Sequence, residues 1–198
     1  MDKEMTATPA SMVTTLAGTP AWLRGAGIIL AGSAFAAFCA HVSLPLLFTP
    51  VPLSLAPFAV LVLGLMLRPR MAAATFVAYL AEGAAGLPVF SPSPASGGLA
   101  HLFGPTGGYL LAYPFAAALI AFLFRRSGRG YAAAFVSAAA GDLVILCCGA
   151  LWLAAFTHLA VTQATVLAVL PFLAGDALKI AAAAAMHSGS ARLLRRTA

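Results

Sequence analysis

Two side chains of opposite charge, Asp176 and Lys179, lie three residues apart in an apolar stretch near the C-terminal end of the sequence. A charge at the centre of a bilayer costs about 2.5–3.5 kcal/mol, so charges kept inside membrane helices tend to mark substrate pathways. In a helix, this spacing separates the two residues by about 4.5 Å along the axis on nearly the same face. They can form a structural ion pair, with Asp176 favoured by the helix dipole in the first turn. We favour the alternative, in which Lys179 takes a ligand carboxylate that enters from outside.

Two further carboxyl groups interrupt apolar stretches. Glu82 is predicted near the outer end of its helix, at a depth similar to that of Asp176. There it either lines the same cavity or reaches the membrane interface. Asp142 is predicted near the middle of its helix, and no cation in that helix offers a partner. This favours a buried carboxyl, hydrogen-bonded or protonated, that holds helices together.

The composition predicts an all-α integral membrane protein. Of the 198 residues, 62% are hydrophobic and only 8% are charged, whereas a soluble domain averages about 25% charged residues. The net charge of +6 does not indicate nucleic-acid binding, because Lys and Arg are scattered at helix ends rather than gathered into a patch. The histidines are dispersed without the spacing of metal ligands, so we expect neither a metal nor a cofactor.

Six apolar stretches predict a single domain of six transmembrane helices over residues 21–198, preceded by a flexible cytoplasmic tail over residues 1–20. The predicted helices cover residues 23–47, 53–67, 71–85, 108–124, 131–156 and 172–194, with a further short helix over 162–170. Ten of the eleven basic residues fall in the N-terminal segment, in alternate connections or at the C-terminus, and Lys179 is the exception. This pattern predicts that both termini are cytoplasmic, as expected in a bacterial cytoplasmic (inner) membrane.

The outer connections are rich in proline and glycine. Residues 44–52 contain three prolines, and residues 86–108 form a long connection that predicts a lid or binding loop. The sequence of residues 104–109, Gly-Pro-Thr-Gly-Gly-Tyr, is predicted to open a helix and is not a phosphate-binding loop. Thr106 and Tyr109 could add a hydroxyl and a ring to a ligand site, although the pattern by itself favours an ordinary tight turn.

Small residues recur every four positions on the first predicted helix, at Gly32, Ala36 and Ala40. Small residues at this spacing allow another helix to approach closely. The partner helix can belong to the same chain or to another protein, and the high alanine content makes chance matches common.

Four stretches together carry a family resemblance: residues 49–53 (TPVPL), 83–90 (GAAGLPVF), 104–110 (GPTGGYL) and 171–179 (PFLAGDALK). In this order and spacing they resemble the BioY family, the biotin-capture subunits (S-components) of energy-coupling-factor (ECF) transporters. The resemblance implies a six-helix S-component fold that holds the vitamin near the outer surface. It also implies that Asp176 and Lys179 contact the ligand, and that the small residues of the first helix, Ala36 and Ala40 with Gly32, dock on a transmembrane coupling subunit.

On this basis we predict a biotin site formed by Asp176, Lys179, Glu82, Tyr109, Thr106 and Phe90. Lys179 would neutralise the biotin carboxylate or anchor another polar end, and Asp176 would accept ureido N–H groups. The chain has no ATP-binding signature, so either ECF coupling and ATPase subunits supply the energy or the protein works alone, with self-association as an alternative.

Three alternatives remain: transport of another small vitamin acid, a membrane scaffold whose charges only pair helices, and an intramembrane aspartyl protease. The protease alternative rests on the Ala-Gly-Asp sequences that end at Asp142 and Asp176. Predicted helix depths separate the two by about 8 Å, too far for carboxyls that share a proton. Lys179 would also hold Asp176 ionised. We therefore expect no enzymatic activity.

Overall fold

The computed structural model describes residues 20–46, 49–92, 97–128 and 130–196, the side chains of 189–196 excepted. The helices are α2 (Ala21–His41), α3 (Ala56–Met66), α4 (Pro69–Ala84), α5 (Leu99–Leu102), α6 (Gly107–Arg126), α7 (Tyr131–Thr157), α8 (Val161–Ala168) and α9 (Leu173–Arg196). Two short strands, β1 (Ser43–Leu44) and β2 (Leu53–Ser54), form a hairpin.

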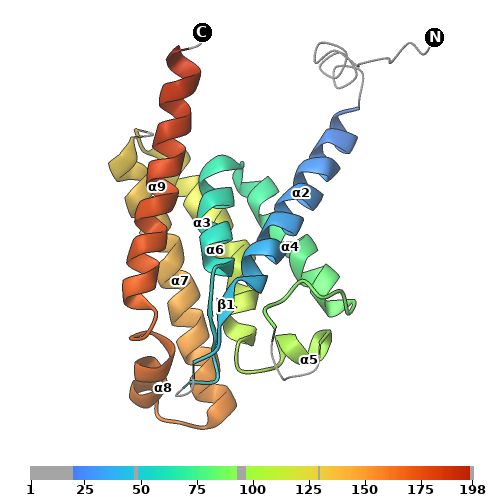
Figure 1. The fold of residues 1–198 in the computed structure, drawn as a ribbon, viewed down its shortest axis with the longest axis vertical. Coiled ribbons are helices and arrows are strands. Elements are labelled where there is room, and N and C mark those ends of the chain that lie inside the picture. The colour runs from blue at the N-terminus through green and yellow to red at the C-terminus, as the bar shows by residue number, and fades with distance from the viewer. Residues whose placement is uncertain (1–19, 47–48, 93–96, 129, 197–198) are drawn as a thin grey trace, which may run out of the picture.

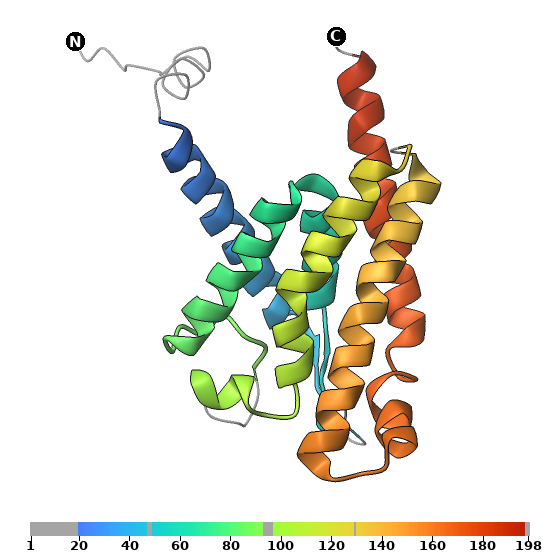
Figure 2. The ribbon, with the colours of Figure 1, turned by 180° about the vertical axis from the view of Figure 1, so that it is seen from behind.

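The helices form an elongated bundle around α6, which packs against α3, α4 and α7 (Figure 1). Helix α2 begins and helix α9 ends at the same end of the bundle, where the turns from α3 to α4 and from α6 to α7 also lie (Figure 2). Helices α5 and α8 lie at the opposite end. This end carries the proline-rich and glycine-rich connections, so the two ends of the bundle differ in chemistry as the sequence predicts.

The first predicted helix is shorter than expected. Helix α2 ends at His41 rather than near residue 47, and β1 pairs antiparallel with β2 so that Ser43 lies opposite Ser54. The prolines that follow β1 lack the N–H group that a helix needs, which favours extended backbone here. Helix α3 consequently begins only at Ala56, whose N–H donates to Ser54 Oγ at 2.9 Å.

Helix lengths do not confirm the predicted number of six spans. Among the described residues, α2, α6 and α7 are long and apolar enough to cross a membrane, and α8 with α9 counts as a fourth span bent by 54°. Helix α3 has 11 residues and α4 has 16, fewer than the roughly 20 that a straight span requires. Large apolar side chains such as Phe38, Phe115 and Leu178 are exposed on the outside of the bundle, as in proteins surrounded by lipid.

Glycines let the helices approach closely around the site. A Cβ on Gly141 of α7 would collide with the side chain of Ile120 on α6, so this position requires glycine for the observed packing.

The small residues of α2 are also buried inside the chain. Gly32 packs against Thr75 of α4, while Ala36 and Ala40 are 1% and 0% exposed within the core. These three residues therefore do not form an exposed docking face, contrary to the prediction for a partner subunit.

Candidate functional site

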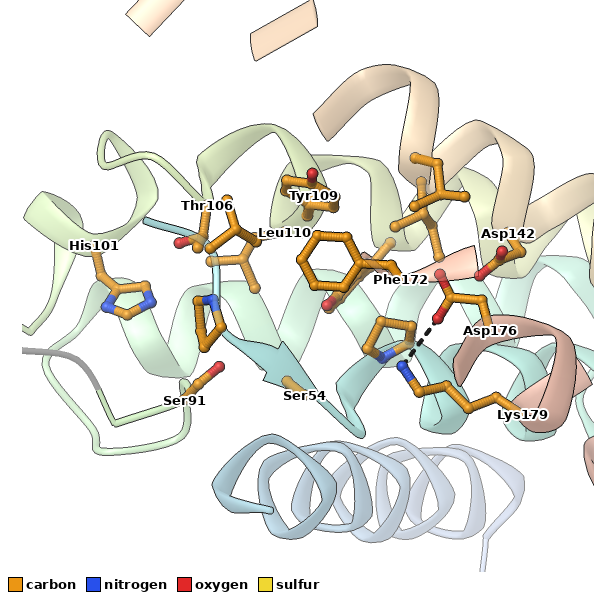
Figure 3. Close-up of a pocket in the computed structure, with 16 residues that line it drawn as sticks. Ser54, Ser91, His101, Thr106, Tyr109, Leu110, Asp142, Phe172, Asp176 and Lys179 are labelled. Atoms are coloured by element: carbon orange, nitrogen blue, oxygen red, sulfur yellow. Dashed lines mark hydrogen bonds and ion pairs between the residues drawn. The ribbon is translucent and has the colours of Figure 1, made fainter. Parts of the chain in front are cut away.

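A small chamber of about 50 Å³ lies between the hairpin, α6, α7 and α9 (Figure 3). Most of its wall is apolar, with polar groups gathered at its two ends, which is the pattern of small-molecule sites. Its lining residues are Val51, Pro52, Ser54, Pro57, Ser91, His101, Thr106, Tyr109, Leu110, Tyr113, Asp142, Ile145, Leu146, Phe172, Asp176 and Lys179. Four of the predicted site residues are among them.

Asp176 and Lys179 form the ion pair that their spacing allows, which was the less favoured of the two alternatives from the sequence. Asp176 lies in the first turn of α9, and its N–H donates to the Phe172 carbonyl at 2.8 Å. Lys179 Nζ lies 2.9 Å from Asp176 Oδ1. The two residues are only 8% and 4% exposed, and both line the chamber. The two residues therefore form an ion pair with each other and also line the chamber.

Asp142 joins this end of the chamber, which the sequence analysis did not predict. It extends from α7 with 4% exposure, beside the Asp176–Lys179 pair (Figure 3). Its Oδ1 is shielded from solvent and has no hydrogen-bond partner among the residues that the structure describes. The sequence placed Asp142 and Asp176 at different depths, whereas in the structure both carboxyl groups line the same end of the chamber (Figure 3). The sequence contains one indication that Asp142 is unusual, because α7 contains no Lys or Arg that could pair with its carboxyl group.

The other end of the chamber carries neutral polar groups: Ser91, His101 and Thr106 (Figure 3). Thr106 therefore lines the chamber, and its contact with a ligand stays a prediction. The His101 ring is buried and stacks on Phe90, with ring centroids 5.1 Å apart. Burial lowers the pKa of His101, because a charged imidazolium would lose its hydration. At neutral pH this end is therefore uncharged.

Tyr109 forms a wall between the two ends. Its hydroxyl donates to the Ala168 carbonyl at 2.7 Å, and its ring packs edge-on against Phe172. The hydroxyl thus ties α6 to the end of α8, which leaves the ring to face the chamber. Gly149 of α7 makes room for this ring, since a Cβ there would collide with it.

Residues 104–108 mainly allow the start of α6 to pack closely against its neighbours. A Cβ on Gly107 would collide with the Leu102 carbonyl, and one on Gly108 would collide with Trp152. The Trp152 indole Nε1 donates to the Gly104 carbonyl at 2.9 Å. These contacts bring the start of α6 against α7, which agrees with the tight turn considered from the sequence.

Glu82 and Phe90 are not among the residues that line the chamber. Glu82 accepts a hydrogen bond from Ser33 Oγ and so connects α4 to α2. The Phe90 ring fills the space above Gly83 and lies 5.3 Å from the Tyr79 ring. The structure therefore does not bring these two predicted residues into the site, although Phe90 supports His101 from behind.

Comparison with known proteins decides the family. The BioY family model matches residues 7–196. The chain belongs to the BioY family. A probable biotin transporter BioY of Pyrococcus horikoshii is 41% identical over 134 residues, which cover 68% of this chain and 76% of that protein. The biotin transporter BioY2 of Lactococcus lactis subsp. cremoris is 32% identical over 152 residues, 77% of this chain and 81% of that protein.

The fold agrees with this BioY assignment. A crystal structure of the S-component for biotin from an ECF-type ABC transporter superposes with a TM-score of 0.75 at 24% identity, covering 94% of this chain and 95% of that one. The chain thus has the S-component fold and is a multi-pass membrane protein. The named BioY relatives are transporters, so the chain is not the protease that the neighbouring aspartates Asp142 and Asp176 suggested.

Proposed function

We propose that this protein captures biotin and transports it across the membrane. The observation that carries the proposal is the buried Asp176–Lys179 pair, which faces a mostly apolar chamber. The relatives named as biotin transporters support biotin over another small vitamin acid, which remains the alternative ligand. A buried ion pair alone contributes little net stability, so its location at a chamber favours recognition over scaffolding.

The charges in the chamber indicate which polar group of biotin would lie at each end of the chamber. Asp142, Asp176 and Lys179 together carry no excess positive charge, so their end suits the neutral ureido group better than the biotin carboxylate. Asp176 would accept a ureido N–H, and Lys179 would donate to the ureido oxygen. Of the two roles predicted for Lys179, this is the anchoring of a polar end other than the carboxylate.

The remaining chamber residues suit the rest of the ligand. The rings of Tyr109 and Phe172 would cover the apolar body. Thr106 and Ser91 would donate hydrogen bonds to the carboxylate at the opposite end, close to the outer surface. Glu82 and Phe90 would support the site without touching the ligand.

Binding would require the chamber to open. Its volume of about 50 Å³ is well below the roughly 300–1,000 Å³ of pockets that bury a small molecule. Residues 51–54 and Ser91 come from the outer connections and form one wall. We propose that these segments move outward to admit biotin and then close over it.

We further propose a topology of six spans over residues 21–198 with both termini cytoplasmic, preceded by a cytoplasmic tail over residues 1–20. Helices α3 and α4 would act as short spans within the bundle. The protein would reside in a bacterial cytoplasmic membrane and work with ECF coupling and ATPase subunits. Self-association would replace these partners if the chain transports biotin alone, and the uptake of labelled biotin by cells that contain only this chain would distinguish the two cases.

A thermal-shift experiment tests the capture of biotin. A ligand that binds only the folded state raises the melting temperature by mass action. We expect biotin, but not a vitamin acid that lacks a ureido group, such as pantothenate, to raise the melting temperature of the purified chain. A shift with pantothenate alone would overturn the ligand assignment, and no shift with either would overturn capture.

A further inference from the structure

Asp142 lines the chamber and has one carboxyl oxygen that makes no hydrogen bond with the described residues. Its side chain is 4% exposed, and Oδ1 has neither solvent nor a partner within the described structure. Buried polar atoms are nearly always hydrogen-bonded, so an unpaired one at a binding chamber indicates a group that a ligand completes. Neither the family match nor the sequence pattern assigns this residue a role in binding a ligand; the sequence pattern favours a structural carboxyl.

Among the described residues, the groups that face Asp142 include no cation that pairs with it alone. Helix α9 contributes Asp176 and Lys179, which pair with each other, and α6 contributes the neutral phenols of Tyr109 and Tyr113. His101 of α5 lies at the opposite end of the chamber (Figure 3). Two ionised carboxylates beside one ammonium would leave an excess negative charge in a buried site, which is costly. A proton on Asp142 removes that excess.

We propose that Asp142 carries a proton and binds the ureido group of biotin at two points. Its O–H donates to the ureido oxygen, and its carbonyl oxygen accepts one ureido N–H. This inference rests on the proposed capture of biotin and adds a residue to that site. An ionised Asp142 would lack the donor and would repel the ureido oxygen.

The count of hydrogen bonds supports a protonated Asp142. A cyclic urea has two N–H donors and one oxygen that accepts two hydrogen bonds. Lys179 and protonated Asp142 supply two donors, while Asp176 and the Asp142 carbonyl supply two acceptors. Every polar atom of the ureido group would then be satisfied, which matters because each buried unsatisfied group is costly. The same arrangement would reject a carboxylate, which has no N–H to donate.

Two substitutions at Asp142 separate the protonated from the ionised form. Asp142→Asn has the shape of the acid and keeps one donor and one acceptor, while Asp142→Leu removes both. Calorimetric titration of biotin into the full-length wild type and both variants, from neutral to alkaline pH, measures the effect. Ser137→Ala, at a buried position of the same helix outside the chamber lining, is the matched control.

We expect Asp142→Asn to bind biotin within about threefold of the wild type at neutral pH, and Asp142→Leu to bind about 30-fold more weakly. We also expect the wild-type affinity to fall at alkaline pH more steeply than that of Asp142→Asn. An Asn variant that loses biotin like the Leu variant, or declines with pH like the wild type, would overturn the protonated form. If Asp142→Leu does not fold, the Asn variant alone decides. A wild type that fails to bind biotin would instead refute the proposed function.

Discussion

Lys179 Nζ lies 2.9 Å from Asp176 Oδ1 inside the protein, with both residues more than nine-tenths buried. Removing two charges from water costs several kcal/mol per ion, and their mutual attraction repays this only in a favourable geometry. An apolar pair of similar size would often stabilise such a position equally well. The two charges are therefore best explained by a role in ligand recognition at the chamber that they line.

We predict that breaking this pair destabilises the protein more than replacing it. Lys179→Met leaves the Asp176 carboxylate buried without a partner, which should cost about 3–5 kcal/mol of unfolding free energy. The double variant Asp176→Leu/Lys179→Met removes both charges and should recover most of that loss. Unfolding in detergent, followed by circular dichroism, compares the two. Equal stability of the single and double variants would contradict a direct interaction between the residues.

The close approach of α6 to α7 predicts an intolerance of side chains at Gly108. A Cβ there would meet Trp152 and the Cys148 carbonyl, so Gly108→Ala should destabilise the fold by about 1–3 kcal/mol. Gly27→Ala is the matched control, because no atom lies within 4 Å of the added Cβ. Alanine should stabilise helix α2 there by about 0.5–1 kcal/mol. Melting temperatures that fall equally in both variants would argue against this packing.

The hydrogen bond from Tyr109 to Ala168 predicts a cost for removing one oxygen atom. Tyr109→Phe keeps the ring in the chamber wall but leaves the buried Ala168 carbonyl unpaired, which should cost about 1–3 kcal/mol. Tyr131→Phe, at a half-exposed position, should change stability far less. Biotin affinity should change little in Tyr109→Phe, since the hydroxyl faces α8 rather than the ligand. A large loss of affinity without a loss of stability would assign the hydroxyl to the ligand instead.

His101 predicts an acid-sensitive component of stability. Burial lowers its pKa below the value of about 6.5 expected in the unfolded chain. The unfolded chain therefore takes up a proton first as the pH falls, and folding loses stability below about pH 6.5. Above that pH the contribution is fully present. Unfolding measured over this range should show a smaller acid loss for His101→Phe, which keeps the ring against Phe90. His41→Phe, on the exposed end of α2, should behave like the wild type.

Apolar patterning predicted much of the architecture. The predicted helix over residues 131–156 matches α7 within a residue at its end, and the short helix over 162–170 corresponds to α8. The spacing of Asp176 and Lys179 also indicated that they could pair, because helical geometry is local. The helix ends predicted around residues 42–55 were wrong, because a hairpin lies there. A hairpin with two residues per strand is too short to show a hydrophobic period in the sequence.

The candidate site was only partly predictable from the sequence. The depth of a side chain in the bundle depends on how distant helices pack, and the residues around it in the sequence do not encode this. Asp142 of α7 and Asp176 of α9 line the same end of the chamber, and no pattern within either helix encodes how these two helices pack. Glu82 was predicted as a site residue only from its depth. Its hydrogen-bond partner Ser33 lies 49 positions away in the sequence, so the local pattern could not reveal this contact. Likewise, the burial of Ala36 depends on which face of α2 meets α4.

Calorimetric titration of biotin into the purified wild type and the Asp176→Leu/Lys179→Met double variant tests the central claim most directly. The wild type should bind biotin saturably. A double variant that still melts cooperatively should lose at least about 100-fold in affinity, because hydrogen bonds to charged groups contribute about 1.5–3 kcal/mol each. Equal affinity in the two proteins would contradict the claim that this ion pair recognises the vitamin.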